Sequence, residues 1–132
     1  MLLALMSHID AILRNFAWND RYDEESFVGV LHERCLWDME KYWDLEAALY
    51  DLAEHRDELP VVTWPLFRIF SYMMVSFGAH FDPNDHFSIG NLPNEQVHEY
   101  RERIQLVFEG LFSGEMPDQS SCFDMMNPRL EG

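Results

Sequence analysis

Apolar residues recur at intervals of three and four along most of the chain. The pattern covers residues 2–16, 27–36, 39–52 and 97–111, with polar residues at most of the remaining positions. This spacing is typical of helices that bury one face. Signals for β-strands are confined to the short VVT stretch near the middle of the chain. The pattern therefore predicts an all-α fold.

Polar residues mark where the first three helices begin and end. The Asn-Asp pair at residues 19–20 favours a turn after the first helix. We expect Asp23 to cap the second helix, with Glu24 and Glu25 in its first turn, where carboxylates suit the helix dipole. The third helix is expected to begin at Asp38, just before its apolar stripe.

The segment WPLFRIFSYMMVSFGAH, residues 64–80, is apolar nearly all round. Such a helix is expected at the centre of a domain. We expect Thr63 to cap it after an extended LPVVT segment, Pro65 to lie in its first turn and Gly78 to mark its end. Arg68 interrupts the apolar run and is expected to pair with a carboxylate, because an unpaired buried charge is costly. The stretch FRIFSYMMVSFGAHF, residues 67–81, is also too short to span a bilayer.

The last long helix is expected to open at Pro93 and Asn94. Residues 113–132 are rich in turn-forming residues, with one short helical turn expected at CFDMM. We therefore predict a single all-α domain over residues 1–132, a bundle of about five helices with an irregular C-terminal tail. Residues 1–5 are a candidate upstream extension.

Charge narrows the classes of partner. The 132-residue chain has 24 acidic and 9 basic residues and a net charge of −15. Residues 20–58 alone hold 13 acids against 4 bases. Such a chain repels nucleic acid and anionic membranes but attracts proteins that bind nucleic acid. We therefore expect no direct nucleic-acid partner and no membrane partner.

Two features indicate the compartment. Cys35 and Cys122 lie far apart in the sequence and do not make a disulfide framework. The first residues are apolar for only about one turn and lack the basic region of a signal peptide. A cytoplasmic protein is the expected reading.

The loop HFDPNDHFSI, residues 80–89, concentrates ligand-type side chains. His80, Asp82, Asp85 and His86 are suitable types for zinc, manganese or iron, but the two histidines lack the spacing of a helical ligand pair. A calcium loop that began at Asp82 would need glycine at its sixth position and glutamate at its twelfth, where this chain has phenylalanine and proline. The Asp-Pro-Asn-Asp core favours a type I turn instead. We expect no bound metal and no cofactor.

No catalytic motif accompanies this loop. The chain has no GxSxG, GxGxxG or P-loop sequence, and neither cysteine lies in a pattern typical of a nucleophile. Trp37, Trp43 and Trp64 fall at helical positions and are expected in the core. The sequence thus favours a protein that is not an enzyme.

Four blocks of the chain carry a family resemblance: WNDRYDEESFVGVLHERCLWDMEKYWDLEAALYDL, WPLFRIFSYMM, HFDPNDHFSI and ERIQLVFEGLFSGEMPD. Together they resemble an all-helical family of bacterial immunity proteins, which accompany polymorphic toxins, including those of contact-dependent growth inhibition. The likeness runs from about Asn15 to Asp124 and rests on these blocks rather than on a catalytic signature. It implies a cytosolic, non-enzymatic protein that binds the C-terminal domain of a cognate toxin, often a nuclease.

Charge and resemblance converge on one hypothesis. A nuclease's substrate groove is basic because it must hold phosphates, and an acidic helical protein can occupy that groove and exclude the substrate. Contacts are expected from acidic residues near helix ends and loops. The candidates are Asp20, Asp23, Glu24, Glu25, Glu40, Asp44, Asp82, Asp85, His86, Glu115 and Asp118.

Two alternatives remain open at this point. One is a metal-dependent enzyme that uses His80, Asp82, Asp85 and His86. The other is an acidic nucleic-acid mimic that inhibits a DNA-binding protein, which predicts carboxylates at regular spacing along one face.

Overall fold

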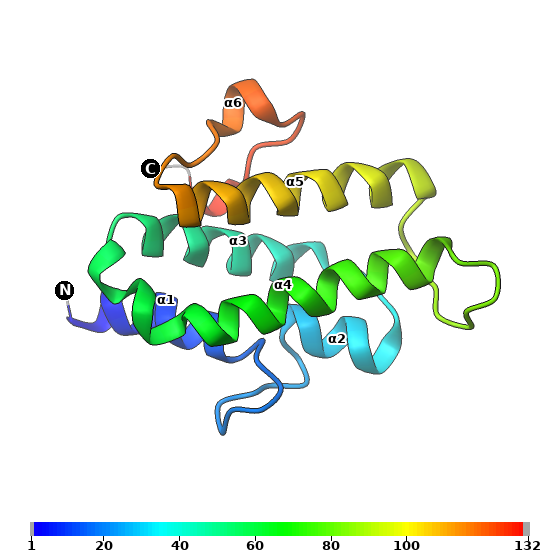
Figure 1. The fold of residues 1–132 in the computed structure, drawn as a ribbon, viewed down its shortest axis with the longest axis horizontal. Helices are drawn as coiled ribbons and strands as arrows, with labels where there is room; N and C mark the ends of the chain where they lie inside the picture. The colour runs from blue at the N-terminus through cyan, green and yellow to red at the C-terminus, as the bar shows by residue number, and fades with distance from the viewer. Residues whose placement is uncertain (1, 131–132) are drawn as a thin grey trace.

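The structure is a computed structural model that describes the backbone of residues 2–130 and the side chains of residues 8–130. These residues fold into helices and loops without a β-strand, which confirms the predicted all-α class (Figure 1). The elements in chain order are α1 (Leu2–Leu13), α2 (Phe27–Arg34), α3 (Met39–Ala53), a 3-10 turn η1 (Arg56–Glu58), α4 (Leu59–Phe81), α5 (Asn94–Ser113), α6 (Gln119–Cys122) and a 3-10 turn η2 (Pro128–Leu130).

Four long helices surround the core. Helix α1 packs against α3 and α4, and α5 packs against the same two helices from the other side. Helix α2 is short and packs on α3. In Figure 1, α4 lies across the front of the bundle and no other element covers its outer side.

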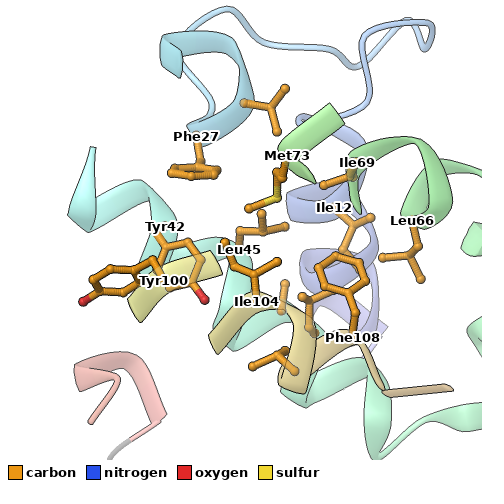
Figure 2. Close-up of a cluster of buried hydrophobic side chains, with 14 of the residues drawn as sticks. Ile12, Phe27, Tyr42, Leu45, Leu66, Ile69, Met73, Tyr100, Ile104 and Phe108 are labelled. Atoms are coloured by element: carbon orange, nitrogen blue, oxygen red, sulfur yellow. The ribbon is translucent and has the colours of Figure 1, made fainter. Parts of the chain in front are cut away.

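The core forms where the apolar faces of these helices meet. Figure 2 shows Ile12 of α1, Leu66 of α4 and Phe108 of α5 converging on one another. Each fully buried side chain of this size contributes about 1.5–3 kcal/mol relative to an exposed one. The apolar pattern predicted over residues 97–111 is confirmed as the inner face of α5, whose buried apolar side chains are Val97, Tyr100, Ile104, Val107, Phe108 and Leu111.

Local sequence signals correctly placed the starts of α3 and α5 and misplaced those of α2 and α4. Asp38 caps α3, with its Oδ1 accepting from Lys41 N at 3.2 Å, and α5 begins at Asn94, as expected. The cap of α2 is Ser26 rather than Asp23, and the Ser26 hydroxyl accepts from Gly29 N at 3.0 Å. Asp23 instead accepts from the backbone of Glu25 at 2.9 Å, in a turn that precedes the helix.

Helix α4 is longer at both ends than expected. It begins at Leu59 with Pro60 in its first turn, so Pro65 lies inside the helix and Thr63 is not a cap. The Thr63 hydroxyl donates to Leu59 O at 2.9 Å, as a residue within a helix can. The helix also continues past Gly78 to Phe81, and the Phe81 side chain packs against the core.

The extra length makes this helical segment long enough to be compared with a membrane-spanning helix. Residues Arg56–Phe81 form one helical segment of 26 residues that is long and apolar enough to cross a membrane by length and composition alone. The expectation that this region is too short was therefore wrong. A core helix can pass the same test, and the inner side of α4 packs into the bundle through Val62, Leu66, Ile69, Met73 and Phe77.

The tail after α5 is irregular, as predicted, but its helical turn is α6 at Gln119–Cys122 rather than at CFDMM. Gly114 ends α5 with a positive φ of 96°, a conformation that suits glycine. Farther along, Gln119 and Asn127 are buried against α3 and α5. These two polar residues hold the tail to the bundle.

Candidate functional site

The outer face of α4 carries a row of exposed apolar side chains. Val61, Trp64, Phe67 and Val75 are between 55% and 72% exposed. Between Leu59 and Phe81 the chain has no aspartate or glutamate, although it has 24 of them in total. Contiguous exposed apolar surface marks interaction sites in many proteins. We call this face, made of Val61, Trp64, Phe67, Arg68, Ser71 and Val75, the α4 strip.

Helical geometry explains why the strip is continuous. Residues 61, 64, 68, 71 and 75 alternate intervals of three and four, which places them along one side of a helix. The opposite side holds the buried positions that pack into the core. The helix is therefore apolar on two sides, and one bundle can bury only one of them.

Arg68 lies at the centre of an aromatic stack. Its guanidinium carbon is 4.2 Å from the centre of the Trp18 ring and 5.7 Å from that of Trp64. The Trp64 and Phe67 rings are stacked, with centroids 5.9 Å apart and 21° between their planes. We call these four residues the aromatic–arginine stack. It links the α1–α2 loop to the α4 strip.

This stack corrects two expectations. Arg68 has no carboxylate within ion-pair distance among the described side chains, and the faces of two tryptophans take the place of the expected partner. Trp64 is exposed rather than part of the core, whereas Trp37 and Trp43 are buried as predicted. Tryptophan and arginine are the residues most enriched at binding hot spots.

Asn15 positions the loop that brings Trp18 to the stack. Its side chain is buried, donates to Ala11 O at 2.9 Å and accepts from Val28 N at 2.8 Å. These bonds tie the end of α1 to the start of α2. The loop between the two helices is thereby held beside the middle of α4 (Figure 1).

A surface pocket of about 260 Å³ adjoins the stack. Its walls include Phe16 and Trp18 of the loop, His32 of α2, and Arg68 and Tyr72 of α4. Burial is the main cause that raises the pKa of the Tyr72 hydroxyl. The hydroxyl therefore stays protonated at neutral pH and can donate a hydrogen bond. The pocket offers a mostly apolar cavity with a few polar groups, which suits one side chain of a partner.

Exposed acidic residues lie before and after α4 in the sequence and on the loop that carries Trp18. Asp20 and Glu24 are exposed on that loop, while Asp57 lies in η1, two residues before the helix begins. Asp82 and Asp85 follow its last residue and are exposed. An apolar centre with a charged rim is the usual anatomy of a protein interface.

The loop HFDPNDHFSI is a turn whose polar side chains make hydrogen bonds to nearby parts of the chain. Asp82 accepts from Asn84 N at 2.9 Å and Asp85 accepts from Phe87 N at 2.8 Å. His80 accepts from Ile89 N through Nδ1, and its Nε2 is 2.7 Å from the side-chain oxygen of Asn94. Among the described side chains, these residues and the exposed His86 do not gather at ligand spacing. The geometry gives no support to a metal-dependent enzyme built on this loop.

The remaining predicted contact residues lie elsewhere and are mostly paired within the chain. Glu25 binds Arg34 and Lys41. Arg129 lies 2.8 Å from both Glu40 and Asp44 and joins them to the C-terminal tail. Asp118 caps α6, and hydrogen bonds from Ser120 and Ser121 lower the pKa of its carboxyl. Glu115 is exposed just after α5.

The predicted acids therefore fall into separate groups. Asp20 and Glu24 lie on the loop that carries Trp18, and Asp82, Asp85 and His86 lie in the loop that follows α4, while the pairs on Arg129 and the residues after α5 belong to other parts of the chain. Sequence reasoning missed the apolar centre itself. The available signal was a helix that is apolar on all sides, because such a helix carries more apolar surface than one small core can bury.

Comparison with protein-family models, curated proteins and solved structures gave no match to this chain.

Proposed function

We propose that this chain is an immunity-type protein that binds a basic toxin domain, a nuclease, and blocks its substrate surface. The observation that carries the proposal is the exposed α4 strip, apolar and free of carboxylates, in a chain of net charge −15. This arrangement suits a protein partner better than a small molecule, because an outward-facing helix surface encloses little of a small ligand.

Charge supports a basic partner. The exposed acids on the Trp18 loop and on either side of α4 in the sequence attract a positive surface and speed its approach. They repel the anionic headgroups of a bacterial inner leaflet, which disfavours the membrane as the occupant of the same strip. A phosphate-binding groove is positive for its own reasons, and it therefore complements this rim.

The aromatic–arginine stack supplies the anchors. Trp18, Trp64 and Phe67 present flat apolar area at a small cost in side-chain entropy. Contact with a partner would remove these exposed rings from water and would enclose Arg68 between aromatic faces. We expect the strip to provide most of the binding free energy. The acids are expected to raise the association rate and to select between partners.

Co-expression with a basic toxin domain, taken first from a neighbouring gene, tests the proposal. The wild-type chain is expected to restore growth and to co-purify with the toxin domain as one complex. Trp18→Ala and Trp64→Ala are each expected to raise the Kd by about 30-fold, as loss of a hot spot of about 2 kcal/mol does. Met125→Ala removes an exposed apolar side chain of the tail, outside the strip, and is the matched control.

The outcomes separate the proposal from its rivals. Absence of both complex and protection would contradict the immunity function. Unchanged binding by both tryptophan variants would show that the interface lies elsewhere on the protein, outside the α4 strip. Binding to many unrelated DNA-binding proteins in place of one toxin would favour a nucleic-acid mimic.

A further inference from the structure

Three ligand-type side chains meet at one end of the bundle, away from the loop HFDPNDHFSI. His8 comes from α1, His55 precedes η1 and Glu58 ends it. One potential ligand atom from each residue lies within 4.8 Å of the other two. The three residues belong to two segments that are far apart in the sequence, so this cluster exists only in the folded chain.

His8 is buried and its Nε2 has no hydrogen-bond partner. The residue is 3% exposed, and the nearest charged group, Glu58 Oε1, is 3.7 Å from Nε2, beyond hydrogen-bond distance. A buried polar atom left unsatisfied is unfavourable, and folded proteins rarely keep one without a reason. A ligand held between His8 and Glu58 would satisfy this nitrogen.

His55 is oriented as a metal-binding histidine is. Its Nδ1 lies 2.9 Å from the carbonyl oxygen of Asp51. A carbonyl only accepts, so this contact assigns the proton to Nδ1 and leaves the lone pair on Nε2. Histidines that bind metals usually donate their other ring N–H to a carbonyl or carboxylate in this way, which fixes the ring and its tautomer.

The geometry points to a site for one zinc ion, with His8 Nε2, His55 Nε2 and a Glu58 carboxylate oxygen as its ligands. Two histidines and one glutamate are an established zinc ligand set, and they leave a fourth position for water. Zinc bonds of about 2.1 Å place tetrahedral ligands roughly 3.3 Å apart. The ligand atoms of the cluster lie up to 4.8 Å apart, so an ion would require the three side chains to close in and the two stacked imidazoles to turn until both lone pairs face it.

The local charge favours a cation. Glu58 supplies a carboxylate within the cluster, and the carboxylate of Asp51 lies close enough to be influenced by both histidines. A bound ion would join α1 to the segment between α3 and α4, and it would keep the two stacked imidazoles, with centroids 5.2 Å apart, in one arrangement. Its three ligands lie outside the α4 strip, although Glu58 directly precedes α4, and the inference does not rest on partner binding.

Metal titration of the purified chain tests this inference. The chain is prepared without a histidine tag, stripped with a chelator and titrated with zinc at neutral pH, with cobalt as a spectroscopic substitute. We expect binding of one ion per chain, the intense visible absorption of tetrahedral cobalt and a rise in Tm with zinc. His55→Ala and Glu58→Gln are each expected to weaken zinc binding by more than about 100-fold.

Controls keep the result interpretable. His86→Ala removes an exposed histidine of the other loop and is expected to leave zinc affinity unchanged. His8→Ala is informative only if circular dichroism shows that the stripped variant folds, so the half-buried His55 and Glu58 carry the test. Absence of stoichiometric zinc binding, or equal affinity in His55→Ala and the wild type, would overturn the site.

Discussion

Arg103 donates to both carboxylate oxygens of Glu46, from Nε at 2.7 Å and from Nη2 at 2.9 Å. The two residues lie on α5 and α3 and are buried. Three neutral side chains complete the coordination of the carboxylate: Tyr42, Gln119 and Asn127 each donate to it. The only buried ion pair among the described residues is thus fully hydrogen-bonded on its acidic side.

Removal of one member of this pair should destabilise the fold strongly. Glu46→Ala leaves the Arg103 guanidinium buried without its counter-charge, and the free energy of unfolding should fall by about 3–5 kcal/mol. Urea unfolding followed by circular dichroism measures the change. Arg34→Ala breaks the exposed pair with Glu25 and should cost no more than about 1 kcal/mol. Equal losses in the two variants would contradict this ranking.

Asn127 should control the attachment of the tail. Its side-chain nitrogen donates to Trp43 O and to Glu46, both at 3.0 Å, and the residue is almost fully buried. Asn127→Ala leaves those acceptors short of a donor and should lower the free energy of unfolding by about 1–3 kcal/mol. Hydrogen exchange should then rise most in residues 115–130. A uniform rise over all helices would show that the tail does not loosen separately.

Two glycines provide a matched comparison. A Cβ on Gly29 would lie 2.5 Å from Glu24 O, a backbone atom that cannot move aside cheaply, whereas a Cβ on Gly78 meets nothing within 4 Å. Gly29→Ala should therefore destabilise the chain, by about 1–3 kcal/mol. Gly78→Ala should stabilise it by about 0.5–1 kcal/mol, because alanine loses less backbone entropy in a helix. Thermal unfolding of both variants checks the opposite signs.

Alkaline pH should loosen the contact between α3 and the tail. Burial raises the pKa of Tyr50 to about 12, and its hydroxyl donates to Pro117 O at 2.7 Å. The unfolded chain loses this proton near pH 10, so the folded state binds it more tightly. The resulting stability is fully present below about pH 10 and is lost as the pH rises towards 12.

Tyr50→Phe isolates this effect. The variant should be slightly less stable at neutral pH, because Pro117 O loses its donor, and its stability should decline less steeply above pH 10. Urea unfolding across this pH range gives both slopes. Identical alkaline slopes for variant and wild type would contradict the role of Tyr50.

The sequence predicted helices where the signal is local. Asp38 and Asn94 stand within one turn of the helices that they open, and both starts were placed correctly. The start of α4 depends on tertiary packing, because Val62 and Leu66 are buried in the core and hold the first turns of the helix against it. Ser26 caps α2 in place of Asp23, since the backbone of Asp23 and Glu24 packs directly against Gly29.

Contacts between residues far apart in the sequence could not be predicted from the spacing of apolar and polar residues. Glu46 and Arg103 are 57 positions apart, and nothing in the spacing of either helix joins them. The aromatic–arginine stack has the same origin, since Trp18 reaches Arg68 only through the loop that Asn15 holds in place. The exposed acids could be predicted because they lie in loops. The α4 strip could not be predicted, because the sequence does not show which side of this apolar helix the bundle buries.

The position of Asn127 near the C-terminus determines when the domain can finish folding during protein synthesis. The ribosome adds Glu46 to the chain 81 residues before it adds Asn127. Until that residue leaves the ribosome, the carboxylate on α3 lacks one of its donors and Trp43 O lacks its partner. Helices can form earlier, but the domain reaches its final stability only when the tail closes over this acid. Ribosome-bound chains that stop before residue 127 should therefore remain sensitive to proteases.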